Sequence, residues 1–224
     1  MSTARRAPRS EVTLRERAYD AFTHHLLRSD IKPGQFMSQR ELVMLTGQPL
    51  GAIRELIPRL EAEGLIITVP QRGLQILPLD INLIRNAFQF RLILEREAIA
   101  TFIQTASAAR IEEIERAHRG IVEAAAEGVT ASLVATAQQV DREFHEGLID
   151  ELNNDIISKA YRVNWIKVRL IRQSETSLDE DLVIPVMREH LAIIAAIKTR
   201  NAAAAVESAT AHIMNARTRA LRLE

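Results

Sequence analysis

The chain has 224 residues, which suits one small module followed by a larger one, and apolar residues, 47% of the total, can form a substantial core. Glycine, proline and aromatic residues are few, as is typical of a mainly helical protein. The net charge is zero and cysteine is absent, which excludes disulfides and thiolate metal sites, so any metal must be held by nitrogen and oxygen donors.

Charge is shared unevenly between two parts of the chain. Residues 1–78 carry eleven Lys and Arg against eight Asp and Glu (+3), whereas residues 79–224 carry eighteen against twenty-one (−3). A basic front part fits a surface that faces nucleic acid. The densest apolar run, Leu191 to Ile197, is far shorter than a membrane span, and the first fifteen residues have no apolar core. We therefore expect a cytoplasmic protein with no membrane partner.

A basic arm and a helix begin the chain. Residues 1–11 contain three arginines and almost no apolar side chain, which predicts a flexible arm. From Thr13 apolar residues recur at helical spacing as far as Leu27, and a turn over residues 32–34 ends the run.

Two more helices and a hairpin follow. Ser38 and Glu41 form a capping box that opens the second helix, and Gly47 closes it. Pro49 takes the first position of a third helix, which ends at Gly64. Two strands and the turn between them predict a hairpin at residues 65–69, 70–73 and 74–77. These elements form a winged helix-turn-helix domain over residues 12–78.

This layout binds DNA because a helix fits the major groove and presents its first turns to base edges and phosphates. Arg54 lies opposite the apolar stripe of the third predicted helix, where it faces solvent. Arg40, at the start of the second helix, could reach a phosphate, and Arg72 at the wing tip could enter a neighbouring groove.

Four motifs lie in this head: Ser38-Gln-Arg-Glu-Leu leading to Gly47, Ile53-Arg54-Glu55, Arg59-Leu60-Glu61-Ala62-Glu63-Gly64-Leu65, and Arg72-Gly73. Together they resemble the GntR family of bacterial repressors. The resemblance covers the whole head and implies DNA-contacting positions at Arg40, Arg54, Gln71, Arg72 and Gly73.

The start of the third helix departs from that family. Members usually carry a stretch resembling Ser-Arg-Thr-Pro there, whereas this chain has Pro49-Leu50-Gly51-Ala52. A base-reading arginine is therefore missing, and Leu50 offers at most an apolar contact to a thymine methyl group. Pro58 inside the same helix should cost about 3 kcal/mol and bend it, unless the helix is already irregular at that point.

The back part shows helical stripes one after another and no strong strand signal. We expect six helices, near residues 81–105, 108–127, 130–150, 153–173, 179–199 and 201–222. Short connections between them predict an antiparallel bundle over residues 79–224. The predicted fold is therefore mainly α, with a winged helix-turn-helix domain followed by an all-α antiparallel helical bundle.

Four ligand-type side chains lie in these helices: Asp141, His145, His190 and His212. Asp141 and His145 are one helical turn apart and point the same way. Each histidine alone is more often a core residue than a ligand. Together, neutral imidazoles and a carboxylate suit Zn best, with Ni, Mn or Fe as alternatives, rather than Ca or Mg.

The spacing of these residues resembles a second family. Asp-x-x-x-His at residues 141–145, then Glu189-His190-x-x-Ile-x-x-Ala-Ile, then a histidine about twenty residues later resemble the FCD effector domain, which follows the GntR head in FadR-type members. The resemblance implies that these four residues hold a divalent metal.

Two polar residues interrupt apolar stripes of the bundle. Arg91 lies among apolar residues of the first bundle helix and needs a partner, which is either Glu95 one turn on or a carboxylate effector beside the metal. Asn164 interrupts a later stripe in the same way and is either a hydrogen-bonded core amide or an effector contact.

The combined prediction is a homodimeric transcriptional regulator, a repressor first of all, that reads a palindromic operator in double-stranded DNA. A metal and a small organic acid in the bundle would modulate operator binding. Two alternatives stay open: a metal-dependent enzyme that activates water at the Asp/His site, and a regulator in which the metal itself is the signal or a structural staple.

Overall fold

The chain divides into two compact units, Met1–Pro78 and Leu79–Glu224. This computed structural model describes residues 13–175 and 180–221, with the side chains of residues 172–180 left aside. The basic arm expected at residues 1–11 lies outside the described residues. Within the described part, no helix is long and apolar enough to cross a membrane.

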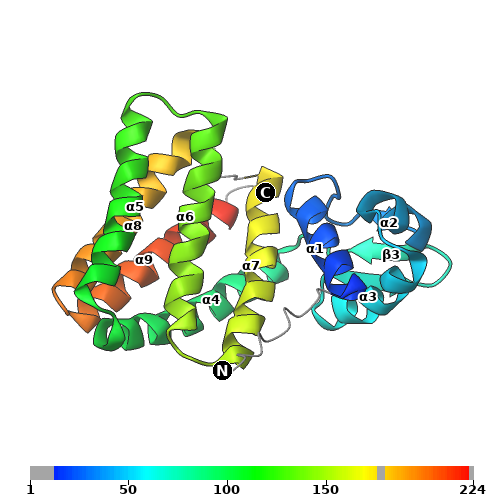
Figure 1. Ribbon diagram of the computed structural model, residues 1–224, viewed down its shortest axis with the longest axis horizontal. Helices are drawn as coiled ribbons and strands as arrows, with labels where there is room; N and C mark the ends of the chain where they lie inside the picture. The colour runs from blue at the N-terminus through cyan, green and yellow to red at the C-terminus, as the bar shows by residue number, and fades with distance from the viewer. Residues whose placement is uncertain (1–12, 176–179, 222–224) are drawn as a thin grey trace, which may run out of the picture. The chain divides into compact units, whose positions relative to one another are not determined.

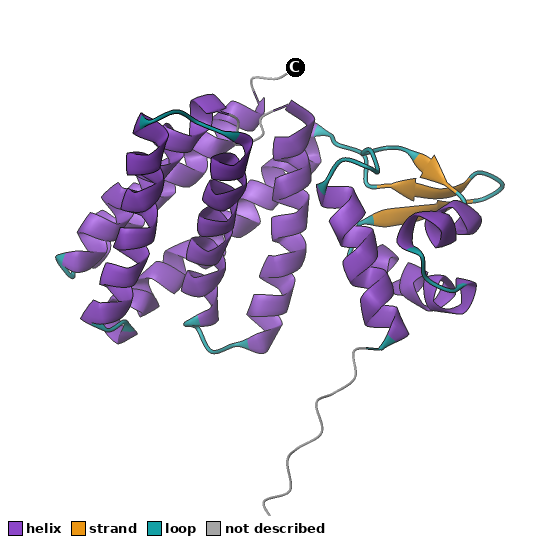
Figure 2. Ribbon diagram, turned by 45° about the horizontal axis from the view of Figure 1, so that its top comes forward, coloured by secondary structure: helices purple, strands orange, loops and turns teal. Residues whose placement is uncertain are grey.

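The first unit, called the head, combines helices with a small antiparallel sheet, drawn in orange in Figure 2. Its described elements are α1 (Leu14–Leu27), β1 (Phe36–Met37), α2 (Gln39–Thr46), α3 (Leu50–Ala62), β2 (Ile66–Val69) and β3 (Gly73–Ile76). Strand β3 lies in the centre of the sheet, between β1 and β2. The hairpin β2–β3 forms the expected wing. Strand β1 was not predicted, because two residues are too short to show an alternating pattern.

Helix ends in the head follow local chemistry. Ser38 and Glu41 form the capping box that opens α2, and Gly47 ends the helix with φ 65° in the left-handed region. Pro49 is the N-cap of α3, one position before the predicted place, and makes no side-chain capping bond. Helix α3 continues through Pro58 for one further turn.

The Arg-Leu-Glu-x-Glu motif holds the head together. Arg59 lies over the ring of Tyr19, 3.6 Å from its centroid, and its Nε donates to Glu63 Oε1 at 2.9 Å. The Tyr19 hydroxyl donates to Glu63 Oε2 at 2.7 Å, while Glu61 Oε1 accepts from the backbone N–H of Thr68 at 3.1 Å. The motif therefore joins α1, α3 and the wing, so these residues have a structural role.

The second unit is a helical bundle, shown in Figure 1. Its described helices are α4 (Ile81–Thr105), α5 (Ala108–Ala126), α6 (Ala131–Asp150), α7 (Asp155–Glu175), α8 (Glu180–Lys198) and α9 (Ala202–Leu221). Every boundary lies within two residues of its predicted place. Asp80, Ser107 and Thr130 cap α4, α5 and α6 by accepting a backbone N–H three residues on.

Among the described residues of the bundle, the core consists of three apolar clusters with polar residues where they meet. The largest cluster draws on every helix of the bundle, and two smaller ones lie around Phe88 and around Met187. On α9, His212 lies between Ala209 of the largest cluster and Ile213 of the second. We call the buried polar group at this junction the polar centre; its members are Arg91, Glu95, Asp141, His145, His190 and His212.

Candidate functional site

The structure brings the four predicted metal ligands together at the polar centre. His145 and Asp141 come from α6, His190 from α8 and His212 from α9, and none is more than 4% exposed. His190 Nε2 lies 3.2 Å from His145 Nε2 and 3.3 Å from His212 Nε2. Asp141 Oδ1 lies 3.7 Å from His190 Nε2 and 3.9 Å from His145 Nε2.

Two of the three imidazoles are oriented by carboxylates on their outer side. His145 Nδ1 is 2.8 Å from Glu95 Oε2, and His212 Nδ1 is 2.6 Å from Glu189 Oε2. A carboxylate can only accept, so both Nδ1 atoms carry the proton and donate it. The Nε2 atoms of His145 and His212 therefore present lone pairs to the polar centre.

The third imidazole is oriented by another histidine, His118 on α5. His118 Nδ1 donates to the backbone carbonyl of Ile114 at 2.7 Å, and burial lowers the pKa of His118, so the ring is neutral and its Nε2 accepts. His190 Nδ1 lies 3.1 Å from that Nε2 and donates to it. The Nε2 lone pair of His190 is thus also directed into the polar centre.

Electrostatics favour the neutral form of the His190 and His212 rings. Burial and the neighbouring histidines hold the pKa of His190 well below its ordinary value. Burial lowers the pKa of His212 to about 4, although its hydrogen bond to Glu189 acts in the opposite direction. Glu189 stays ionised: burial would raise its pKa, but hydrogen bonds from His212 and Arg219 lower it to about 2.

The donor set fits a divalent transition metal. Two ring nitrogens that each lie about 2.1 Å from one ion are about 3.0–3.4 Å apart at octahedral or tetrahedral angles. The two measured Nε2 separations at His190 fall in this range. The Asp141 oxygen lies a few tenths of an ångström further out, which a small side-chain shift would correct. Three uncharged lone pairs and a carboxylate oxygen are the donors that Zn, Ni, Mn and Fe prefer.

Arg91 lies beside these nitrogens and pairs with Glu95. Its Nε donates to Glu95 Oε1, and its Nη2 lies 2.6 Å from His145 Nε2. Burial would lower the pKa of Arg91 and raise that of Glu95, but the attraction between the two charges reverses both shifts. The Tyr161 hydroxyl donates to Glu95 Oε1 at 2.6 Å, so the carboxylate is fully engaged.

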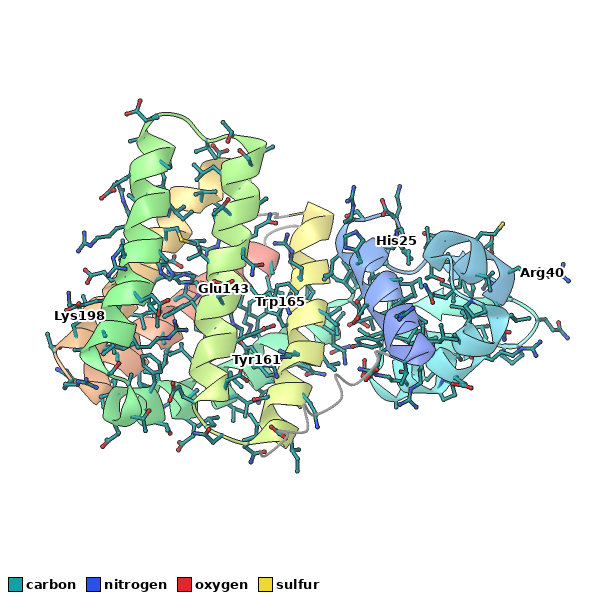
Figure 3. The ribbon with its side chains drawn as sticks, in the orientation of Figure 1. His25, Arg40, Glu143, Tyr161, Trp165 and Lys198 are labelled. Carbon is teal, nitrogen blue, oxygen red and sulfur yellow. The ribbon has the colours of Figure 1, made fainter. Side chains whose placement is uncertain are left out.

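A pocket opens beside the polar centre, between α4, α6 and α7. Among the described residues, α4 and α6 contribute Arg91, Asp141 and His145. Helix α7 contributes Tyr161, Asn164, Trp165, Val168 and Arg169. Figure 3 shows Tyr161 and Trp165 on the side of α7 that faces α6. Asn164 Nδ2 donates to the backbone carbonyl of Ala87 at 3.0 Å, which leaves the amide oxygen for the pocket.

The predicted DNA-contacting residues of the helices are exposed. Arg40 projects outward from α2 in Figure 3. Arg54 is exposed on α3, and its Nε lies 3.5 Å from Gln39 Oε1 on α2. Leu50, the first residue of α3, is 39% exposed, so an apolar side chain stands at the start of this helix.

At the wing tip, backbone geometry and stacking position the predicted residues. Gln71 is exposed with φ 62°. Arg72 is exposed and lies over the ring of Phe36, 3.8 Å from its centroid. Gly73 has φ 93°, and a Cβ there would lie 2.8 Å from the carbonyl oxygen of Met37. Only glycine fits this position, so packing alone requires Gly73.

Sequence reasoning missed His118, Glu189 as an outer partner, and the pocket residues Trp165 and Arg169. For His118 a signal was present: on α5 it stands in the apolar stripe of Ile111, Ile114, Ile121 and Ala125. A histidine inside such a stripe needs a partner, as Arg91 does. Arg169 gave no comparable signal, because it is a half-buried arginine on the border of its stripe.

Comparisons with known proteins match both units of the chain. The FCD domain matches residues 86–215, and the bacterial regulatory proteins of the gntR family match residues 14–76. The HTH-type transcriptional regulator BphR of Paraburkholderia xenovorans (strain LB400) is 25% identical over 203 residues, or 85% of this chain and 80% of BphR. The HTH-type transcriptional regulator YdhC of Bacillus subtilis (strain 168) is 22% identical over 194 residues, or 87% of this chain and 85% of YdhC. McbR/YncC of E. coli has a similar fold, with a TM-score of 0.77 at 15% identity over 95% of this chain and 99% of its own.

Proposed function

The chain belongs to the FCD-domain regulators that carry a GntR-type head, and on this basis we propose that its bundle binds a divalent metal and a small carboxylate that modulate operator binding. The protein is a DNA-binding transcriptional regulator, as its relatives are, and not an enzyme. The expected fold class, a winged helix-turn-helix head followed by an all-α bundle, is confirmed.

The metal proposal rests on one observation above all. The buried Nε2 of His190 lies 3.2 Å from that of His145 and 3.3 Å from that of His212, all three lie within 4.8 Å of one another, and each Nδ1 proton is held on the outer side. Lone pairs at this distance repel unless a positive charge lies among them. In this structure the Arg91 guanidinium supplies that charge, with Nη2 2.6 Å from His145 Nε2 and 3.4 Å from His212 Nε2, and a metal cation would take its place. His145, His190, His212 and Asp141 would hold that cation, with zinc the best match and nickel, manganese or iron as alternatives. A bound ion would act as a Lewis acid toward an anionic ligand oxygen.

The carboxylate proposal rests on the pocket beside this site. Arg91 lines it and presents a buried guanidinium, a side chain suited to a carboxylate because its N–H groups donate charge-assisted hydrogen bonds. Asn164 lines the same pocket and adds an amide. A carboxylate there would contact Arg91 and Asn164 next to Asp141 and His145.

We assign DNA binding to residues 12–78, and ligand binding and dimerisation to residues 79–224. In the head, Arg40 and Arg54 would contact phosphates and base edges, and Gln71, Arg72 and Gly73 would approach a neighbouring groove. A homodimer would present two heads to a palindromic operator, as two-fold symmetry requires, in the cytoplasm where bacterial DNA lies.

Regulation of DNA binding would require that the ligand has different affinities for two arrangements of the bundle. A ligand can alter operator binding only if it binds one arrangement of the bundle better than another, and DNA must then alter ligand binding by the same factor. A metal held by α6, α8 and α9 would join three helices at once, next to Arg91 on α4. Small movements of these helices would change its affinity.

The test is a titration of a duplex selected from a random library, with the full chain stripped of metal and reloaded with zinc. We expect zinc together with some small carboxylates to change DNA affinity by fivefold or more. His190→Ala should lose the bound zinc, and Arg91→Lys should lose the response to acid. Arg91→Lys keeps the charge beside Glu95, and Arg96→Lys, an exposed arginine of α4, is the matched control.

The other possible results of this titration lead to different conclusions. If DNA affinity follows zinc and no acid changes it, the metal itself is the signal. If the purified protein binds none of the four metals, the metal proposal fails. If Arg96→Lys and Arg91→Lys behave alike, Arg91 does not contact the acid.

A further inference from the structure

The exposed face of helix α3 changes character along its length. The buried residues of α3, which lie between Ala52 and Leu60, pack into the head, so the exposed residues form the opposite face. In the first turn these are Leu50 and Gly51, neither of which has a polar side chain. The first exposed charge, Arg54, follows one turn after Leu50. The helix that we assign to DNA reading therefore begins with an apolar pair and presents charge only afterwards.

Packing within the head does not explain Gly51. Its backbone is helical, without a positive φ, and a Cβ there would meet no described atom within 4 Å. Alanine would fit this position and would favour the helix, because glycine loses more conformational entropy on folding. At Gly73, by contrast, the fold leaves no room for a Cβ. Glycine also allows the surface of a partner to approach the backbone closely, which gives Gly51 a reason outside the head.

Leu50 lies next to this bare stretch of backbone. Single exposed leucines are common on protein surfaces, so the exposure of Leu50 alone carries no conclusion. Its position is more informative, because the first residues of a recognition helix are the ones that contact base edges in helix-turn-helix domains. The match to the gntR family over residues 14–76 includes this helix.

Thymine is the one base that offers an apolar group in the major groove, its 5-methyl group. Leucine packed against the edge of guanine, adenine or cytosine would leave hydrogen-bonding groups without water or a partner. Against thymine, the Leu50 side chain would shield the methyl group from water, which is favourable. The absence of a side chain at Gly51 would let the helix come close enough for this contact.

We propose that Leu50 and Gly51 recognise the methyl group of one thymine in each operator half-site, in place of a base-reading arginine. Arg54 is four residues, or about 6 Å, further along the helix, so it would contact a guanine or a phosphate within about two base pairs of that thymine. This inference rests on the proposed function, because it assumes that α3 is the helix that reads DNA.

The experiment uses the full chain and the duplex selected from a random library, in whichever form, metal-free or zinc-loaded, binds it more tightly. Each thymine of the half-site is replaced in turn by deoxyuridine at both symmetry-related positions, which removes only the methyl group. We expect replacement of one thymine to weaken binding by about tenfold over the two half-sites, since each buried methyl group contributes about fourfold. Replacement of the other thymines should have little effect.

Three variants connect this loss to Leu50. Leu50→Ala should bind the deoxyuridine duplex as tightly as the thymine duplex, because the contacting side chain is removed. Leu14→Ala removes an exposed leucine from α1 and is the matched control, so it should keep the discrimination. Leu50→Arg should prefer guanine at the same position, because the O6 and N7 atoms of guanine accept from a guanidinium.

Gly51→Ala tests the close approach separately. This variant should melt at the same temperature as the wild type or higher, because the added Cβ has room and alanine favours the helix. Its operator binding should nevertheless weaken by tenfold or more. Unchanged operator binding would refute the role of Gly51.

The outcomes distinguish this inference from the assignment of DNA contacts to α3. If Arg54→Ala and Leu50→Ala both bind the duplex as tightly as the wild type, α3 does not read DNA and the assignment itself fails. If Arg54→Ala weakens binding but no thymine responds to loss of its methyl group, or the selected half-sites share no thymine, α3 reads DNA and the thymine proposal is refuted. A response that persists in Leu50→Ala likewise refutes the role of Leu50.

Discussion

At the scale of single residues, the location of three protons determines what the polar centre can bind. Glu95, Glu189 and His118 each accept the outer proton of one ligand histidine. Two of these acceptors are carboxylates, which can only accept a hydrogen bond. His118 accepts only because its own Nδ1 proton is held by the carbonyl of Ile114. The orientation of His190 therefore depends on a residue that would be two contacts away from the proposed metal ion.

His118→Phe tests this dependence. Phenylalanine fills the space but cannot accept from His190 Nδ1, so the His190 ring loses its fixed tautomer and orientation. Outer partners of this kind usually contribute about tenfold to 100-fold to metal affinity. We expect a decrease of that size in zinc affinity, measured by competition with a chromophoric chelator.

His118→Gln provides the matched variant, since its amide oxygen can still accept from His190. Its zinc affinity should lie between those of the wild type and His118→Phe. Nitrogen-15 spectra of the metal-free protein should also show His190 protonated mainly on Nδ1 in the wild type and as a mixture in His118→Phe. Equal zinc affinity in all three proteins would show that His118 is only a packing residue.

At the scale of the element, helix α3 carries two arginines with different roles. Arg54 is exposed and lies near Gln39, on the predicted DNA-facing side. Arg59, five residues later, lies over Tyr19 and pairs with Glu63, so its charge serves the packing of α1 on α3. On the proposed assignment, different faces of one helix would serve DNA binding and stability.

Exchanging each arginine for alanine should separate these roles. Arg54→Ala should weaken operator binding by about 1–3 kcal/mol and leave thermal unfolding unchanged. Arg59→Ala should lower the stability of the head by about 1–2 kcal/mol, because it removes a cation–π contact and a partly exposed ion pair. DNA titrations and melting curves of both variants provide the comparison. Weakened DNA binding by Arg59→Ala at a temperature where its head is fully folded would contradict the assignment.

At the scale of the whole molecule, a metal at the polar centre would tie together the helices that supply its ligands. A ligand that binds only the folded state stabilises it by about 2.7 kcal/mol at 100 times its dissociation constant. Zinc at that excess should therefore raise the melting temperature of the bundle. His190→Ala should abolish the increase, as calorimetry with and without zinc will show. An equal increase in that variant would place zinc elsewhere on the chain.

The metal-free bundle should become less stable in acid. The folded pKa values of His190 and His212 lie below the ordinary histidine value of 6.5, so the unfolded chain binds more protons between that pH and about 4. Stability should then fall as the pH is lowered through this window, as measured by denaturant unfolding between pH 7.5 and 4.5. Zinc should shift the loss to lower pH, because protons and metal compete for the same lone pairs. A flat profile without zinc would show that these rings are not buried as neutral groups.

Much of the architecture could be read from local patterns. Helix positions in the bundle were predicted within two residues, because each apolar stripe and each capping residue acts over a few neighbouring positions. Strand β1 escaped prediction, since two residues gain their strand geometry only by pairing Phe36 and Met37 with β3. The sequence analysis put Pro49 at the first helical position, whereas it is the N-cap, the residue just before α3. The fixed φ of proline suits both positions, so local sequence does not distinguish them.

The sequence by itself determined a winged head, a helical bundle, membership in the GntR and FCD families, and four ligand-type residues on three helices, because spacing and motif are properties of short segments. Only the tertiary structure decided which nitrogen of each imidazole faces inward and that Arg169 shares a pocket with Arg91. His118 and His190 are 72 positions apart, and Arg169 and Gln138 are 31 apart. Such contacts arise when helices pack, so no local pattern encodes them.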